Sequence, residues 1–361
     1  AGYSLQSGHN NIFIGRESGY NVTTTIQNVI AIGHGAGKGV MTTAVNGSIF
    51  MGTGAGHSVT SGERNLAIGF QALNDLTVGD DNIALGYQAL HDLGTSTFAN
   101  RNIAIGTYAL LSAANNNIND NVAIGYGALS QSVHSDGDNN VAIGTEALSD
   151  LTAGAEGMVA IGRQALRRTN HADSVGSVAI GMNALTSNVS GVGNVAIGYQ
   201  ALDAEDDGDR NTAIGYQALT DQTGFSGEVH NTAVGYTAGA NITTGIRNTI
   251  VGSEAGDNGT TFSGSVFVGQ GAGGTVSTGN NNIAIGLEAM HGGTVTGDNN
   301  IAVGADAGDA LTSAKTNIFM GFQAGSAITT GNENTAIGSR ALSTATTATF
   351  NVAIGGDAMF G

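Results

Sequence analysis

Apolar and polar positions along this chain follow one short pattern, which recurs twenty times at a spacing of 17 to 20 residues. The pattern is clearest in segments such as Asn-Thr-Ala-Ile-Gly (211–215), and we call its Gly position zero. A fixed period of this length is typical of a solenoid, in which each repeat forms one coil and packs on its neighbours. The position-zero glycines are residues 15, 33, 52, 69, 86, 106, 125, 144, 162, 181, 198, 215, 235, 252, 269, 286, 304, 321, 338 and 355.

Each repeat predicts a short strand followed by a turn. Position −1 is aliphatic in every copy, position −2 is Ala in fifteen copies and position −4 is Asn in fifteen. Apolar residues on both faces of so short a run favour a parallel strand that is covered on both sides. Position +4 is Gly in eight copies, which argues against a helix after position zero. We predict an all-β, elongated parallel solenoid over residues 1–361, with one narrow coil of two or three short strands per repeat.

Two positions of the repeat vary together. The five copies with a bulky residue at position −2 all have Gly at position +4, and every copy with Leu or Met at +4 has Ala at −2. Because close-packed interiors tolerate little overpacking, this pattern indicates that the two side chains touch. A straight strand would separate them by roughly 20 Å, so the chain must bend between them, and the invariant Gly is the expected corner. The five bulky residues are Phe13, Phe50, Ile250, Phe267 and Phe319.

The Asn and Ala positions predict further structural roles. Asn side chains stacked from coil to coil can hydrogen-bond to one another and to backbone groups at a corner. The alanines at −2 and +3 form a stripe of small residues, which we expect to lie on the surface and to let neighbouring chains pack closely. In two adjacent repeats, the residues assigned to these structural roles are Gly198, Gly215, Asn194, Asn211, Ala201 and Ala218.

Composition narrows the classes of partner. The formal net charge is −17 and the 11 Lys and Arg are scattered, so we expect no binding to nucleic acid or to anionic membranes, which require a basic patch. The absence of Cys excludes disulfides and thiolate metal sites. No apolar stretch approaches the roughly 18 residues that a membrane-spanning helix needs, so we expect no membrane insertion.

The segments Asn-Val-Ala-Ile-Gly-Tyr-Gln-Ala-Leu (194–202) and Asn-Thr-Ala-Ile-Gly-Tyr-Gln-Ala-Leu (211–219) resemble the repeats of long phage tail-fibre proteins. They are also similar to the Val-Ala-Ile-Gly repeats in the head domain of trimeric autotransporter adhesins. The resemblance extends over all twenty repeats, although the period here is longer than that of the adhesin repeat. It implies a left-handed parallel β-roll, three chains packed around a common axis and binding to extracellular surfaces.

Aromatic residues are the first candidates for ligand contact. Tyr199, Tyr216 and Tyr236 occupy position +1 of consecutive coils, so their rings should stack roughly 5 Å apart. Such a row could bind glycans by ring stacking or serve as a structural ladder, and we favour the ladder. Phe98 and Phe225 lie in the loops that lengthen the two 20-residue repeats, and loops on a rigid scaffold often carry recognition.

Catalysis and metal binding are not predicted. The eight His occupy different phases of the repeat, and neither a nucleophile elbow nor a phosphate-binding loop is present. The acidic clusters lack the spacing of known calcium loops, so we expect solvated loops, no metal, no cofactor and no enzyme activity. The clusters are Asp203, Glu205, Asp206, Asp207 and Asp209, and the smaller pair Asp136 and Asp138.

The expected function is structural and adhesive. We expect the chain to be a segment of a longer homotrimeric fibre, extracellular or on a virion surface, with a phage tail fibre as the first choice. A bacterial surface adhesin or a filament that stacks head to tail is the alternative, and a cell-surface glycan or protein is the expected receptor. Less favoured are an ice-binding solenoid, because Thr is irregular in phase, and a polysaccharide-degrading β-helix, because no groove of clustered carboxylates or basic residues is visible.

Overall fold

The computed structural model describes residues 1–5, 7–42, 45–92, 99–111, 118–131, 137–151, 156–169, 175–223 and 227–360. The chain divides into two compact units, Ala1–Asn183 (unit 1) and Ala184–Gly361 (unit 2). Each unit is a parallel β-solenoid, as the repeat predicts, and the described residues contain no α-helix.

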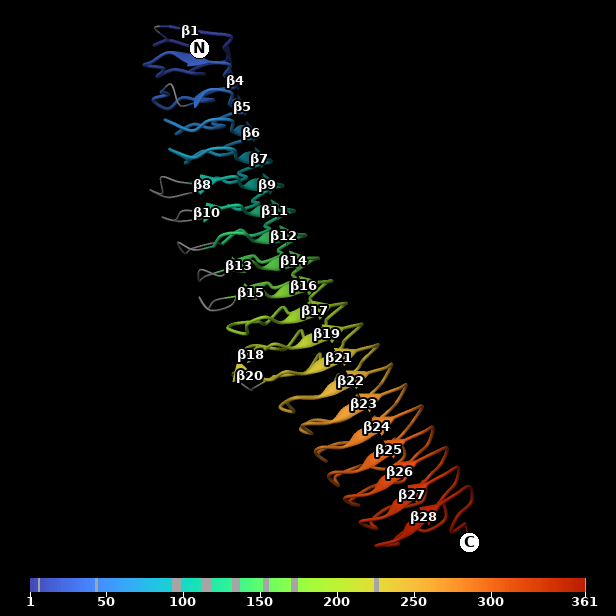
Figure 1. Cartoon of the computed structure of the whole chain (residues 1–361). Coiled ribbons are helices and arrows are strands. Elements are labelled where there is room, and N and C mark those ends of the chain that lie inside the picture. Colours follow the sequence, from blue (N-terminus) through green and yellow to red (C-terminus); the bar gives the residue numbers. More distant parts are fainter. Residues whose placement is uncertain are drawn as a thin grey trace. The chain divides into compact units, whose positions relative to one another are not determined.

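One three-residue strand per coil, at positions −3 to −1, forms the main sheet of each unit. Neighbouring strands pair in parallel so that equivalent residues lie side by side, as Ala196 and Ala213 do. In Figure 1 the arrows from β17 to β28 follow one another in a single column. The strands of unit 1 are β2 (Ile12–Ile14), β4 (Ile30–Ile32), β5 (Ile49–Met51), β6 (Leu66–Ile68), β7 (Ile83–Leu85), β9 (Ile103–Ile105), β11 (Val122–Ile124), β12 (Val141–Ile143), β14 (Val159–Ile161) and β16 (Val178–Ile180). Those of unit 2 are β17 (Val195–Ile197), β19 (Thr212–Ile214), β21 (Thr232–Val234), β22 (Thr249–Val251), β23 (Val266–Val268), β24 (Ile283–Ile285), β25 (Ile301–Val303), β26 (Ile318–Met320), β27 (Thr335–Ile337) and β28 (Val352–Ile354).

Some coils add a two-residue strand outside the main sheet. The coils with this second strand have the two strands predicted, and the other described coils have only one, fewer than predicted. The reason lies in the turn after position zero, where residues such as Gln217 and Leu219 both have a φ of 51°. Left-handed residues cannot continue a strand, yet their N–H groups still donate to carbonyls of neighbouring coils, from Gln217 to Tyr199 and from Leu219 to Ala238. The added pairs are β1 (Gly8–His9) with β3 (Ile26–Gln27), β8 (Ala99–Asn100) with β10 (Ile118–Asn119), β13 (Asp150–Leu151) with β15 (Arg168–Thr169), and β18 (Gly208–Asp209) with β20 (Gly227–Glu228).

The alanine stripe lies in the interior of the coil. Ala201 and Ala218 at position +3 and Ala196 and Ala213 at position −2 are 0% exposed within the single chain. The prediction that this stripe faces other chains is therefore wrong. A coil of 17 residues is so narrow that its opposite walls meet where small side chains stand, so the alanines serve packing within the chain.

The predicted contact between positions −2 and +4 is confirmed. A Cβ built on Gly325 would lie 2.5 Å from the ring of Phe319 in the same coil, which is a severe overlap. Gly308 follows an Ala at −2, and its space is taken instead by Leu311 of its own coil and by Phe319 of the next. One large side chain therefore fills each such volume, wherever in the repeat it originates.

Only one face of the main sheet is covered within the chain. Position −2 of each strand points into the core, whereas positions −3 and −1 point outward. Ile285 and Met320, both at position −1, are 37% and 41% exposed. The prediction of a strand covered on both sides is thus wrong for the isolated chain, since nothing in the described residues packs on the outer face.

Candidate functional site

The position-zero glycines form the corner of each coil, as predicted. Gly198 and Gly215 both have a φ of 139°, a conformation that residues with a side chain rarely adopt. A Cβ on Gly215 would also overlap the backbone carbonyl of Gly235 in the next coil. Two requirements therefore coincide at this corner, a positive φ and a close approach of two backbones.

The Asn residues at position −4 form the predicted ladder, which is buried. Asn300 donates its side-chain amide to Asn282 Oδ1 at 3.1 Å and to the Ala314 carbonyl at 2.8 Å, and its Oδ1 accepts the backbone N–H of Asn317 at 3.1 Å. Asn194 and Asn211 share one of these bonds, in which the Asn211 backbone N–H donates to Asn194 Oδ1 at 2.8 Å. These bonds satisfy backbone groups that water cannot reach. This structural role accounts for the recurring Asn at position −4, and no ligand is needed to explain it.

The acidic cluster is not the solvated loop that the sequence predicts. Glu205 is 1% exposed, and its carboxylate accepts the Gly208 N–H and the Gln222 side-chain amide, each at 2.7 Å. Burial raises the pKa of Glu205 to about 7, although these two hydrogen bonds oppose the rise. The repeat explains the difference: Glu205 occupies position +7, which points into the core, where later coils have Ile242 or Ile328.

Neighbouring acidic side chains serve as hydrogen-bond acceptors between coils. Asp207 accepts Ser190 Oγ at 2.6 Å, Asp209 accepts the Val192 N–H at 2.8 Å, and Asp138 accepts the Asn119 N–H at 2.7 Å. Asp136 lies outside the described residues. Among the described residues, no group of three or more His, Asp or Glu is arranged to hold a metal ion.

The tyrosine row of unit 2 is stacked as predicted. The ring centroids of Tyr199 and Tyr216 are 5.1 Å apart, those of Tyr216 and Tyr236 are 5.3 Å apart, and the planes are within 15° of parallel. The rings therefore cover one another's faces and offer edges and hydroxyl groups to solvent. A sugar that stacks on an aromatic face has no access between them, which favours the structural ladder. Phe98 and Phe225 lie outside the described residues.

The aromatic row of unit 1 ends differently. Phe70 and Tyr87 are stacked at 5.2 Å, but Tyr108 and Tyr126 meet at 74°, with centroids 5.9 Å apart. A groove of about 300 Å³ opens beside Tyr126 at Gly127, where neighbouring coils have Tyr108 and Glu146 at the same position +2. This groove was not predicted from the sequence, although Gly127 stands at position +2, which usually carries a long side chain.

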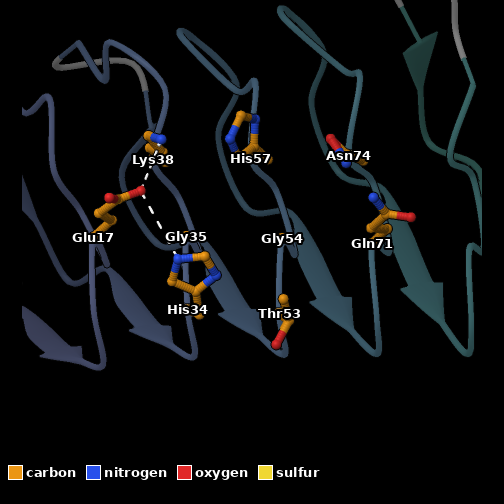
Figure 2. A pocket seen from close by; sticks show the side chains of 9 residues that line it. All are labelled: Glu17, His34, Gly35, Lys38, Thr53, Gly54, His57, Gln71 and Asn74. Carbon is orange, nitrogen blue, oxygen red and sulfur yellow. Dashed lines mark ion pairs between the residues drawn. The ribbon is translucent and has the colours of Figure 1, made fainter.

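A second groove, of about 270 Å³, has the same origin. Gly35 and Gly54 interrupt the position +2 row in two adjacent coils, and polar side chains from four coils line the gap (Figure 2). Glu17 pairs with Lys38 at 2.8 Å, with His34 at 4.0 Å, and the hydrogen bond from Lys38 lowers the pKa of the Glu17 carboxyl. A carboxylate held in this way is a weak base, and the lining contains no nucleophile paired with a base, so the groove offers no catalytic arrangement.

Threonines form short regular rows, contrary to the expectation of irregular phase. Thr312, Thr329 and Thr346 occupy position +8 of consecutive coils. The Thr312 hydroxyl donates to the Thr329 carbonyl at 2.8 Å, and the Thr329 hydroxyl to that of Thr346 at 3.0 Å. These hydroxyls thus join neighbouring coils.

Several basic side chains are paired with acids of neighbouring coils. Arg101 contacts Asp120 at 2.6 Å, and Lys315 contacts Asp298 at 2.8 Å. Both carboxyls have a lowered pKa because of the hydrogen bond from their basic partner. Such pairing works against a basic patch for polyanions.

No protein-family model and no curated protein matches this chain. No helix within the described ranges has the length and hydrophobicity required to cross a membrane.

Proposed function

We propose that this chain is the shaft of a homotrimeric extracellular fibre that presents binding surfaces away from a virion or cell, in the manner of a phage tail fibre. The observation that carries the proposal is the uncovered outer face of the main sheet. Parallel sheets are covered on both faces in most proteins, and here position −1 presents an aliphatic side chain in every coil, beside an aliphatic residue or Thr at position −3. Val251, Ile285 and Met320 are 38%, 37% and 41% exposed. Packing of this face against further copies of the chain would remove it from water.

The same observation favours a shaft over an enzyme. Repeated identical coils make a stiff support, and several weak contacts on such a support gain strength by acting together. A bacterial surface adhesin differs from this proposal in its setting alone and makes the same structural demands.

The experiment is the native mass by light scattering after size exclusion. We expect three times the 35.9 kDa of the chain. A variant in which Lys replaces Val251, Ile285 and Met320 should have a lower mass than this, because these residues lie in alternate coils on the outer face. The control variant carries lysines at Tyr236, Leu287 and Phe322, which are 50% to 52% exposed at position +1, and should keep it. A monomeric wild-type chain, or equal dissociation of both variants, would contradict the proposal.

A further inference from the structure

The groove beside Gly127 in unit 1 has the features of a binding site for a small polar ligand. Gly127 is the gap in a row of long side chains: a Cβ built on it would meet nothing closer than Glu146 and Ser130, both at 3.8 Å. The resulting volume of about 300 Å³ lies at the lower end of the range for ligand pockets, so it suits a single small ring.

Tyr126 provides one wall of this groove. It is 52% exposed, and it meets Tyr108 at 74° instead of stacking on it. The next coil has Thr145 at position +1, so neither face of the Tyr126 ring is stacked on another ring among the described residues. Tyr236 in unit 2 is equally exposed, but one of its faces is covered by Tyr216. Within the described ranges, both faces of Tyr126 are thus free of stacking, whereas every ring of the stacked ladder has at least one face covered.

Polar groups surround the ring. One Glu146 oxygen accepts the Gln164 side-chain amide at 2.7 Å, which leaves the other oxygen for an outside donor. Ser130 and Gln131 add a hydroxyl and an amide to the lining. An aromatic face beside a carboxylate, an amide and a hydroxyl matches a sugar, whose ring has apolar C–H faces and a rim of hydroxyl groups.

The charges of the groove select among sugars. Glu146 and Asp150 contribute two negative charges and Arg167 one positive charge, which is 3.4 Å from Asp150. The groove is therefore net negative, as the chain is, with a formal charge of −17. A negatively charged ligand would be repelled by this net negative charge, so a sugar that carries a carboxylate or sulfate is disfavoured.

We propose that the groove formed by Tyr108, Tyr126, Gly127, Ser130, Gln131 and Glu146 binds one neutral pyranose ring of a glycan. The assignment deepens the proposed adhesive function and rests on it for its biological role. All the groups come from a single chain, however, so the site does not require the trimer.

The test is saturation-transfer NMR on the full chain with methyl glucopyranoside, methyl galactopyranoside and methyl mannopyranoside as probes, and glucuronate as the charged comparison. At least one neutral probe should receive saturation at its ring C–H protons, with an affinity about tenfold above that of glucuronate. Tyr126→Ala removes the aromatic wall and should weaken binding about tenfold.

Gly127→Gln fills the groove with the side chain found at this position in other coils and should weaken binding as much. It should fold normally, because Gln71 and Gln88 adopt φ values of 52° and 50° at position +2, close to the 61° of Gly127. Tyr236→Ala is the matched control and should leave binding unchanged. Absence of binding by all three neutral probes, an equal loss in Tyr236→Ala, or equal affinity for glucuronate would overturn the assignment. Because the mass is measured on the same samples, a monomer that binds sugar would contradict the fibre alone, and a trimer that does not would contradict the site alone.

Discussion

Unit 2 contains two kinds of interior within one backbone design. At position +7 the earlier coils have Asn188, Glu205 and Gln222, whereas later coils have Leu311 and Ile328, and all five are buried. The corner is nonetheless the same, with φ of 139° at the position-zero glycines 198 and 215 and of 131° and 132° at 321 and 338. The backbone corner therefore specifies the coil, and the side chain that fills the core at position +7 (the filler) can be polar or apolar.

A polar side chain can replace an apolar one at position +7 where it finds hydrogen-bond partners in the core. Gln222 donates to Glu205 at 2.7 Å and accepts from Asn231 at 3.0 Å, so a chain of polar groups crosses the core from coil to coil. It is incomplete, because Asn188 Oδ1 and Asn211 Nδ2 are buried without a partner. An unsatisfied buried group costs about 1–3 kcal/mol, so we expect the polar-filled coils to open more readily than the later coils.

The largest expected effect comes from substituting the corner glycines, which both regions share. Gly215→Ala and Gly321→Ala each place a Cβ against the carbonyl of the next coil at a strained φ, and should cost more than about 3 kcal/mol in local stability. Hydrogen exchange of the surrounding amides measures the loss. Gly157→Ala is the control: it also has a positive φ, of 65°, but nothing lies within 4 Å of the added Cβ, so about 1 kcal/mol is expected. Equal effects at the three sites would show that φ alone accounts for the corner.

The next largest effect is a pH dependence of local stability, which we expect in the coils around Glu205 and not in the later coils. The pKa of Glu205 is raised to about 7 in the folded chain, from an ordinary value of 4.5. Between these values the folded state holds a proton that the unfolded state has lost, so stability should fall as pH rises from 4.5 to 7, by about 3 kcal/mol in total. Hydrogen exchange around Glu205, compared at pH 5 and pH 8, should show the fall.

Glu205→Gln keeps the shape of the side chain without the titration and should abolish most of this pH dependence. The control is Glu254→Gln, because Glu254 is exposed at position +2 of a later coil. A wild-type chain whose local stability near Glu205 is the same at both pH values would contradict the buried carboxyl.

A smaller effect tests the apolar filler. Gly325→Leu adds a second large side chain beside Phe319 and should cost about 2 kcal/mol. The double variant Phe319→Ala, Gly325→Leu recreates the Ala213–Leu219 pair of another coil and should regain most of the loss. Thermal unfolding of the single and double variants gives the coupling energy, and additive losses would argue against a shared volume.

The smallest effect concerns the tyrosine ladder, in which Tyr199 and Tyr216 belong to coils with a polar residue at position +7. Tyr216→Ala removes two stacked contacts and should cost about 1 kcal/mol. Leu287→Ala, at position +1 of a later coil and 50% exposed, should cost less. If the two losses are the same by thermal unfolding, stacking contributes nothing beyond burial of area.

Much of the fold could be predicted because the repeat shows each position twenty times. The joint variation of positions −2 and +4 was enough to predict that Phe319 and Gly325 touch. The same evidence could not show which wall of the coil faces outward, since Ala at +3 suits a tight interior and a close interface equally well. The alanine stripe was therefore placed on the wrong side, and the aliphatic row at position −1 was not recognised as part of the exposed face.

Individual sites were harder to predict, because they depend on departures from the repeat. Glu205 looked like one carboxylate in an acidic loop, and only its position +7, once the fold was known, placed it in the core. The open face of Tyr126 depends on the 74° angle to Tyr108, which no spacing encodes.

The coil, its corner glycines, the Asn ladder and the stacked tyrosines follow from the amino-acid pattern alone, because each recurs at a fixed phase and coils in parallel register align equal positions. The packing of neighbouring coils was needed to show which apolar rows are buried, which polar residues lie in the core, and where a missing side chain opens a groove. Those outcomes depend on what neighbouring coils place in the same volume, and a volume shared between coils cannot be read from one repeat alone.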